Sequence, residues 1–340
     1  MSNVATLKRI TQWLNYVVAI PFLTLGIVGA ILTVIIFTKQ RSFWRNASIT
    51  YLLAGAIVTG IHLPMIYTQS ILVHGFGLGL FNTNDRACRE HNYLLYMTTV
   101  AAITFPCWAA FDQYVSTSRN ATFRNRWSSI RVARWAIVIT VIFWTIVYLP
   151  IIFVSGIVNG VCVLQSGTFT LFNTYFLTPF VYSVGPLIIM TIFTLGTVRN
   201  LRSITDSSRQ NRLAKQVRQM LIPQLIVLGI SGVPFGFQGI YLELTNGIEK
   251  DPFRLAMEDL LGQIILLSFH CNYVCTFYIY LYVSSEVRKA FKHLILKCIR
   301  HNNIISIDTT NHTQTSGQKL NIVQYSSYEG AVRTAHANNS

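Results

Sequence analysis

Charged residues are scarce in this sequence. Asp, Glu, Lys and Arg make up 11% of its 340 residues, whereas hydrophobic residues make up 52%. Soluble domains carry about 25% charged residues, so this chain has too little charge to cover a water-exposed surface. Together with a mean hydropathy of +0.44, the composition excludes an ordinary soluble enzyme and indicates a protein whose solvent is the lipid bilayer.

Charge is also missing from seven long apolar stretches of 23 to 25 residues. They contain no Lys, Arg or Glu, and Asp112 is their only Asp. About 20 apolar residues suffice for a helix to cross the hydrocarbon core, and a central charge costs about 2.5–3.5 kcal/mol to insert. We therefore predict an all-α membrane protein with a seven-transmembrane helix bundle over residues 13–283, its helices at 13–37, 49–73, 93–115, 135–157, 175–198, 220–242 and 260–283.

Lys and Arg gather on one side of this predicted bundle. Of the 27 basic residues, 21 lie in the segments after the first, third and fifth stretches and in the C-terminal region. Because positively charged loops stay in the cytosol, we expect a plasma-membrane protein with an extracellular N-terminus (residues 1–12) and a cytoplasmic C-terminus. The net charge of +15 then reflects topology, so no nucleic-acid partner is expected.

Residues 284–300 are expected to form a short amphipathic helix on the inner membrane surface. From Val287 onward, apolar residues recur there at i, i+4, i+7 and i+8 with Lys and Arg between them, a pattern typical of an interfacial helix. Cys298 near its end is a candidate for palmitoylation or an idle thiol. The tail, residues 301–340, is polar and is expected to be a disordered cytoplasmic segment.

Cysteine is also uncommon, with six residues in the chain. The predicted topology places two of them, Cys88 and Cys162, in extracellular loops, where the compartment permits disulfides. We predict that these two are bonded. Such a bond would attach the second outer loop to the head of the third helix.

Several short motifs stand in order along the seven stretches: GIVGAIL at 26–32, LAGAI at 53–57, Asp112-Gln113-Tyr114, Trp144, Pro186, Pro234 and Tyr280. In that order they resemble the GxxGNxL, LAxAD and DRY motifs, the helix-four Trp, the helix-five and helix-six prolines, and the NPxxY motif of the rhodopsin-like (class A) G-protein-coupled receptors. The chain is identified as a divergent member of that family by this register.

The resemblance implies a receptor that binds an extracellular ligand, a small molecule or a peptide, in the outer half of the bundle and activates a heterotrimeric G protein. It also implies arrestin and a receptor kinase as partners. No enzymatic activity, cofactor or metal is expected. The residues implied in coupling and switching are Asp112, Gln113, Tyr114, Pro234 and Tyr280.

Two departures from the family pattern concern the inner end of the bundle. Gln113 replaces the Arg of the resembled triplet, and Ala214 stands where helix six usually supplies an acidic partner. Because a neutral amide and a methyl group cannot form an ion pair, we expect a weakened inner latch and raised basal activity. We also expect Asp112 to bond Arg or Tyr groups of the loop after the third helix.

Two further departures concern the bundle interior. Residues 55–57 supply no carboxylate for the sodium site of the family, and a buried cation without one is poorly compensated, so we expect no sodium modulation. Gly232 occupies the position of the family's helix-six toggle Trp. The bulk for any such switch would then come from Phe235 or Phe237.

The ligand is constrained by what the helices lack. No predicted helix contains Lys, which excludes a retinal Schiff base, and Leu95 replaces the Asp that pairs with biogenic amines in related receptors. The remaining polar and aromatic residues suggest an uncharged, aromatic-lined pocket, although each is also explained by interhelical hydrogen bonding or interfacial anchoring. The candidates are Tyr96, Tyr175, Gln238, Tyr241, Gln263 and His270.

Two other functions fit seven helices. One is a receptor-like protein that does not couple to G protein, because the triplet Arg and the Asn-Pro of NPxxY are both replaced. The other is a small-solute transporter. The sequence argues against a transporter, because it has no internal repeat and no chain of buried carboxylates. Motifs of intramembrane enzymes, such as HExxH or GxSxG, are also missing.

Overall fold

The computed structural model describes residues 2–40, 43, 46–158, 160–202, 209–245, 247–297 and 299, with side chains for all of these except 2, 202 and 209–216. Met1–Phe291 form one compact unit and Lys292–Ser340 a second. Cys298 and the predicted tail at 301–340 lie outside the described residues.

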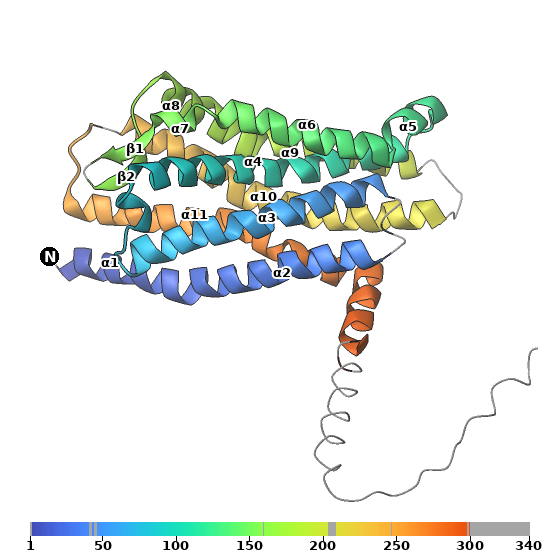
Figure 1. Cartoon of the computed structure of the whole chain (residues 1–340), viewed down its shortest axis with the longest axis horizontal. Coiled ribbons are helices and arrows are strands. Elements are labelled where there is room, and N and C mark those ends of the chain that lie inside the picture. The colour runs from blue at the N-terminus through green and yellow to red at the C-terminus, as the bar shows by residue number, and fades with distance from the viewer. Residues whose placement is uncertain are drawn as a thin grey trace, which may run out of the picture. The chain divides into compact units, whose positions relative to one another are not determined.

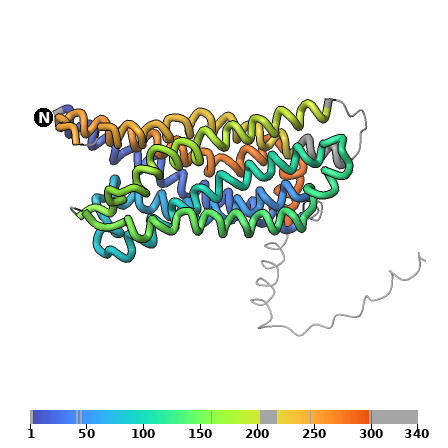
Figure 2. The backbone as a smooth tube through the Cα atoms, turned by 90° about the horizontal axis from the view of Figure 1, so that it is seen from above, coloured from blue at the N-terminus to red at the C-terminus, as the bar shows by residue number. Residues whose placement is uncertain are grey.

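Within this described part, seven helices are long and apolar enough to cross a membrane, which indicates a multi-pass membrane protein. Each contains one of the seven predicted stretches, apart from a short overrun in the fourth. In the first unit they run side by side along one long axis (Figures 1 and 2). They are Asn3–Lys39, Ala47–Gly75, Asp85–Ser116, Ile130–Val154, Thr168–Leu201, Val217–Leu244 and Pro252–Val283.

Four of these spans combine shorter α or π segments, whereas Asp85–Ser116 and Pro252–Val283 are each one α-helix. The elements in chain order are α1 (Ser2–Leu14), η1 (Asn15–Ala19), α2 (Ile20–Lys39), α3 (Ala47–Ser70), η2 (Ile71–Gly75), η3 (Leu80–Asn82), α4 (Asp85–Ser116), α5 (Ala121–Trp127), α6 (Ile130–Tyr148), α7 (Ile151–Val154), β1 (Ser155–Val158), β2 (Val161–Leu164), α8 (Thr168–Phe172), η4 (Asn173–Val184), α9 (Gly185–Arg202), α10 (Arg209–Leu244) and α11 (Pro252–Val283). The helix of the first span already begins at Ser2, so most of the predicted N-terminal segment is helical.

Side-chain caps begin four of the helices. Asn46, Asn84, Asn120 and Ser129 accept hydrogen bonds from backbone N–H groups in the first turns of α3, α4, α5 and α6, at 3.0, 3.0, 3.1 and 3.3 Å. The N–H groups of a first turn have no partner within their own helix, and Asn and Ser supply one. These short polar residues therefore set where the chain leaves each loop.

The fourth predicted span overran its helix. Residues 155–157 belong to β1, which pairs antiparallel with β2 in the register Ser155↔Leu164. Pro150 follows the end of α6, and Gly160 makes the hairpin turn with φ +75°. Apolar composition alone does not distinguish a strand from the end of a helix, so the hairpin was not predicted.

Helix α4 is the centre of the first unit. It packs against α3, α6 and α9 and also contacts β1 and α10. Its residues Val100, Ala101, Phe105 and Ala109 have no exposed surface. Small residues such as Ala101 and Ala109 let neighbouring helices approach closely. Helix α4 therefore runs through the interior and presents residues at both ends of the bundle.

Candidate functional site

The N-terminus and the β1–β2 hairpin lie at the same end of the bundle, which we call the hairpin end (Figure 1). There a disulfide joins Cys88 on α4 to Cys162 on β2, the pairing that the sequence predicts. The hairpin is also held by hydrogen bonds: Cys162 N donates to Asn82 Oδ1 at 2.9 Å, and Ile157 N donates to Asp85 Oδ1 at 3.3 Å. The hairpin is therefore attached to α4 by the disulfide and the Asp85 hydrogen bond, and to η3 by the Asn82 hydrogen bond.

The opposite end of α4 carries the Asp112-Gln113-Tyr114 triplet. Ser48, in the first turn of α3, donates a hydrogen bond to Asp112 Oδ2, and Gln113 Nε2 donates to Ser48 Oγ at 2.6 Å. All three side chains are buried. The expectation that Asp112 bonds Arg or Tyr groups of the following loop missed this contact, since its hydroxyl partner comes from α3.

Tyr114 faces α9 instead. Its ring lies 5.7 Å from that of Phe193, and Asn200 Nδ2 donates to its carbonyl oxygen at 3.4 Å. A Cβ added at Gly196 would lie 2.7 Å from Tyr114 Cδ2. The glycine thus permits close contact between α9 and the tyrosine ring. Ala214 has no described side chain, so its relation to Gln113 lies outside the described residues.

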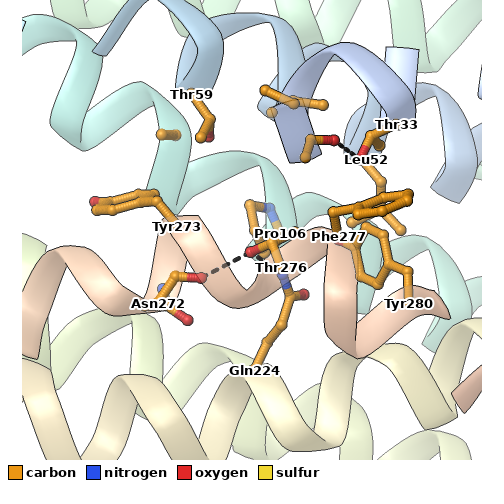
Figure 3. A pocket seen from close by; sticks show the side chains of 15 residues that line it. Thr33, Leu52, Thr59, Pro106, Gln224, Asn272, Tyr273, Thr276, Phe277 and Tyr280 are labelled. Atoms are coloured by element: carbon orange, nitrogen blue, oxygen red, sulfur yellow. Dashed lines mark hydrogen bonds between the residues drawn. The ribbon is translucent and has the colours of Figure 1, made fainter. Parts of the chain in front are cut away.

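A small cavity lies in the middle of the bundle (Figure 3). Its volume of about 30 Å³ has room for a water molecule and is far below the roughly 300–1,000 Å³ of pockets for drug-sized ligands. None of its lining residues is charged. They are Gly29, Ala30, Thr33, Leu52, Gly55, Ala56, Thr59, Ala102, Pro106, Gln224, Asn272, Tyr273, Thr276, Phe277 and Tyr280.

Polar contacts at this cavity connect α10 with α11. Gln224 Nε2 donates to Thr276 Oγ1 at 3.0 Å, and Thr276 Oγ1 donates to the Asn272 carbonyl at 2.8 Å. Tyr280, also at the cavity, is buried and stacks on Phe37 of α2 with ring centroids 5.9 Å apart. The wall of the cavity therefore links three spans.

The register of the LAGAI motif differs from the one the resemblance implies. In the resembled LAxAD motif the Asp aligns with Ile57, but this side chain is 49% exposed on the outside of the bundle. Gly55 and Ala56 line the cavity instead. Within the motif, a carboxylate facing the cavity would therefore have to stand at position 55 or 56 and not at position 57.

His270 lies in an aromatic cluster between the cavity and the hairpin end. It is buried, its Nδ1 lies 2.7 Å from the Leu266 carbonyl, and its ring stacks on His62 with centroids 5.2 Å apart. Phe235 and Phe269 stack beside it at 4.1 Å. Its position is that of a packed core histidine with a satisfied Nδ1.

Gln263 and Tyr241 belong to two separate networks. Gln263 is buried and donates to Asn15 Oδ1 at 3.0 Å, which links α11 to the first span. Tyr241 is 43% exposed and donates to Glu258 Oε1 at 2.8 Å, while Lys250 Nζ lies 2.7 Å from Glu258 Oε2. Both side chains therefore have structural partners.

The other three ligand candidates are dispersed as well. Tyr96 stacks on Tyr148 with centroids 5.9 Å apart, and Tyr175 is 43% exposed. Gln238 lies against α11, where a Cβ at Gly262 would come within 2.6 Å of its Nε2. None of the six candidates lines the cavity of Figure 3, and their role in ligand binding stays a prediction.

The packing around Gly232, two residues before Pro234, is too tight for the Trp that the resembled family has at this position. Pro234 itself is exposed, and Gly232 faces η4, where an added Cβ would lie 3.5 Å from the Tyr182 carbonyl oxygen. That spacing leaves no room for a bulky side chain. Of the two aromatic candidates, Phe235 points into the cluster with Phe269, whereas Phe237 is 58% exposed.

Sequence reasoning overlooked Ser48 and Gln224. A serine near the start of a helix usually caps that helix. The residue type and position of Ser48 therefore do not predict it as a partner for Asp112. Gln224 had a detectable signal, because an amide within an apolar span is expected to bond across helices. No protein-family model matches the chain, and no curated protein matches it in sequence.

Proposed function

We propose that this chain is a divergent rhodopsin-like receptor of the plasma membrane that binds an extracellular small molecule or peptide and activates a heterotrimeric G protein. One observation carries the proposal. A single helix, α4, holds the Cys88–Cys162 disulfide at its head and the buried Asp112-Gln113 pair at its other end. One end of α4 is thus bonded to the proposed extracellular loop, and the other end carries buried polar residues. This arrangement suits a helix that connects a ligand-binding end with a G-protein-coupling end.

The distribution of charge supports an extracellular hairpin end. Helix α5 lies at the opposite end of the bundle from the hairpin (Figure 1), and five Arg stand in and around it, at 119, 124, 126, 131 and 134. Basic loops stay on the cytosolic side. In the proposed orientation the N-terminus is outside and the C-terminus inside.

The contacts between α10 and α11 suggest how a ligand signal would travel. In the proposed mechanism an agonist favours a state in which the inner end of α10 moves outward and admits a G protein. Gln224 and Thr276 join the two helices at the central cavity, and Phe235 joins them nearer the hairpin end. Pro234 lies beside Phe235, where a proline permits a bend.

The segment after α11 supports the proposed eighth helix. The backbone is helical again from residue 285, and Ser284 Oγ accepts a hydrogen bond from Val287 N at 3.3 Å. Val287 is buried, and Phe291 packs on Phe277 with centroids 6.0 Å apart. An amphipathic helix on the cytosolic membrane surface fits this pattern and would adjoin the proposed sites for G protein, arrestin and receptor kinase.

A second candidate is a receptor-like protein that does not couple to G protein. Gln113 favours it, since this amide is 2% exposed and is engaged with Ser48. In this alternative the protein keeps the seven-span scaffold but has no guanidinium at the position of the triplet Arg, where Gln113 stands.

Nucleotide exchange separates the two candidates. The full chain in lipid nanodiscs is mixed with each class of heterotrimeric G protein, and GTP-analogue uptake is compared with empty nanodiscs. We expect ligand-independent exchange for at least one class, lowered in Gln113→Arg, because an added guanidinium beside Asp112 would strengthen the inner latch. Gln113→Met, which removes the amide without adding charge, is the matched control and should not lower exchange.

Two results would decide against coupling. Exchange no faster than in empty nanodiscs for every G-protein class, with or without a chemically diverse ligand library, would favour the uncoupled alternative. Ion or solute flux through proteoliposomes of the same preparation would instead favour a transporter.

A further inference from the structure

Two cysteines of α11 lie in direct contact. The sulfur atoms of Cys271 and Cys275, one helical turn apart, are separated by 3.3 Å. Both side chains are half-buried. They continue an outward-facing line on α11 in which Ile264 is 43% and Tyr282 is 85% exposed, since the intervals of seven, four and seven residues return to the same face of a helix.

The other described cysteines differ from this pair. Cys107 is buried, and its thiol donates to the Ile103 carbonyl of its own helix at 3.4 Å. Cys88 and Cys162 are oxidised to a disulfide. Cys271 and Cys275 are thus the two thiols, among those that the structure describes, that face each other at the surface of the bundle.

Helix geometry keeps this pair in the dithiol form. Residues four apart on a helix have Cβ atoms about 5–6 Å apart, whereas a disulfide requires about 3.5–4.5 Å. Direct oxidation would therefore distort the turn. A bridging atom between the two sulfurs has no such requirement, because it adds a second bond length to the span.

The number of ligands decides the kind of bridging atom, and the sulfur separation is compatible with it. With sulfur bonds of about 2.3 Å, as in zinc sites, a span of 3.3 Å corresponds to an angle of about 92° at the bridge. That angle is narrower than the tetrahedral arrangement of zinc, and no group of three metal-binding side chains occurs among the described residues. Trivalent arsenic, whose pyramidal bonds lie near a right angle, matches it.

We propose that Cys271 and Cys275 form a bidentate dithiol site for trivalent arsenicals on the lipid-facing side of α11. With an organic arsenic oxide, each thiol loses its proton, two As–S bonds form, the As–O bonds break, and the oxygen leaves as one water molecule. Arsenic stays trivalent, so the reaction needs no oxidant or reductant. The bridge cross-links the helical turn that precedes Thr276, the residue that accepts the Gln224 hydrogen bond.

The site is tested with phenylarsine oxide, a membrane-permeant arsenical, on the full chain in lipid nanodiscs. We expect one phenylarsenic group per chain by intact mass, stable to a monothiol and removed by 1,2-ethanedithiol. Because the second As–S bond forms within one molecule, Cys271→Ser and Cys275→Ser should each weaken retention roughly 100-fold. Cys107→Ser is the matched control and should leave retention unchanged.

Peptide mapping of the native protein provides a second measurement that needs no variant. The arsenical should protect Cys271 and Cys275 together from N-ethylmaleimide. Labelling of both residues despite the arsenical, or equal retention by the single-thiol variants, would overturn the proposal. Neither result bears on G-protein coupling, which the nucleotide-exchange assay measures separately.

Discussion

Ser48 and Asp112 lie 64 residues apart in sequence and share a buried hydrogen bond between the start of α3 and the C-terminal end of α4. The same hydroxyl oxygen accepts a hydrogen bond from the Gln113 side-chain amide. One serine therefore holds both of the polar residues with which α4 ends its passage through the bundle.

Removal of this hydroxyl should destabilise the protein. In Ser48→Ala the Asp112 oxygen and the Gln113 amide lose a buried partner, which costs about 1–3 kcal/mol, and the melting temperature in detergent should fall. Ser231→Ala is the matched control, because the Ser231 hydroxyl bonds only to Val227 of its own helix among the described contacts. Equal melting temperatures of the two variants would show that Ser48 does not hold this corner.

Gln224 and Thr276 should be energetically coupled. A double-mutant cycle of Gln224→Leu and Thr276→Val isolates their 3.0 Å hydrogen bond, since the cycle cancels what each change does alone. Interhelical hydrogen bonds in membranes average about 0.6 kcal/mol and reach about 1.7, so a coupling free energy of unfolding in that range is expected. Strictly additive effects on unfolding would contradict the contact.

Two glycines should respond oppositely to alanine. A Cβ at Gly185 would lie 2.7 Å from the Phe180 carbonyl oxygen, whereas one at Gly229 would lie 3.5 Å from Leu187 Cδ2. Because the first obstacle is backbone, Gly185→Ala should cost about 1–3 kcal/mol. Gly229→Ala should be neutral or stabilising by about 0.5–1 kcal/mol through helix propensity. Thermal unfolding measures both effects. A neutral Gly185→Ala would contradict the close contact between position 185 and the Phe180 carbonyl oxygen.

Loss of the disulfide should loosen the hairpin end. Cys88 and Cys162 close a loop of 74 residues, and removal of such a bond typically costs about 2–4 kcal/mol. Hydrogen exchange in Cys88→Ser should rise most in β1 and β2. Cys107→Ser serves as the control, and unchanged exchange in the hairpin would mean that its hydrogen bonds suffice to hold it.

Sodium should not stabilise this protein. The central cavity has no charged residue in its lining, and a cation buried without a carboxylate is poorly compensated. Melting temperatures in sodium chloride and choline chloride of equal ionic strength should therefore agree. Ala56→Asp, which places a carboxylate at the cavity, should make melting sodium-dependent. A sodium-dependent shift in the unmodified protein would sink this prediction.

Local composition and spacing were enough to predict the seven spans and the Cys88–Cys162 pair. An apolar run of more than twenty residues is enough to predict a membrane-spanning helix. The pairing of Cys88 with Cys162 was predicted from the order of the loops along the chain. These inferences need no knowledge of how one helix is rotated against another.

Helix rotation and pairing were decided by packing. Ser48 as the partner of Asp112, the burial of Gln263 against Asn15, and the inward Phe235 beside an outward Phe237 all depend on which face of a helix meets its neighbour. In a soluble helix the polar face reveals that orientation, but a helix in lipid is apolar on nearly every side. Its rotation is therefore set by small residues, buried amides and ring stacking across helices, which only the folded bundle brings together.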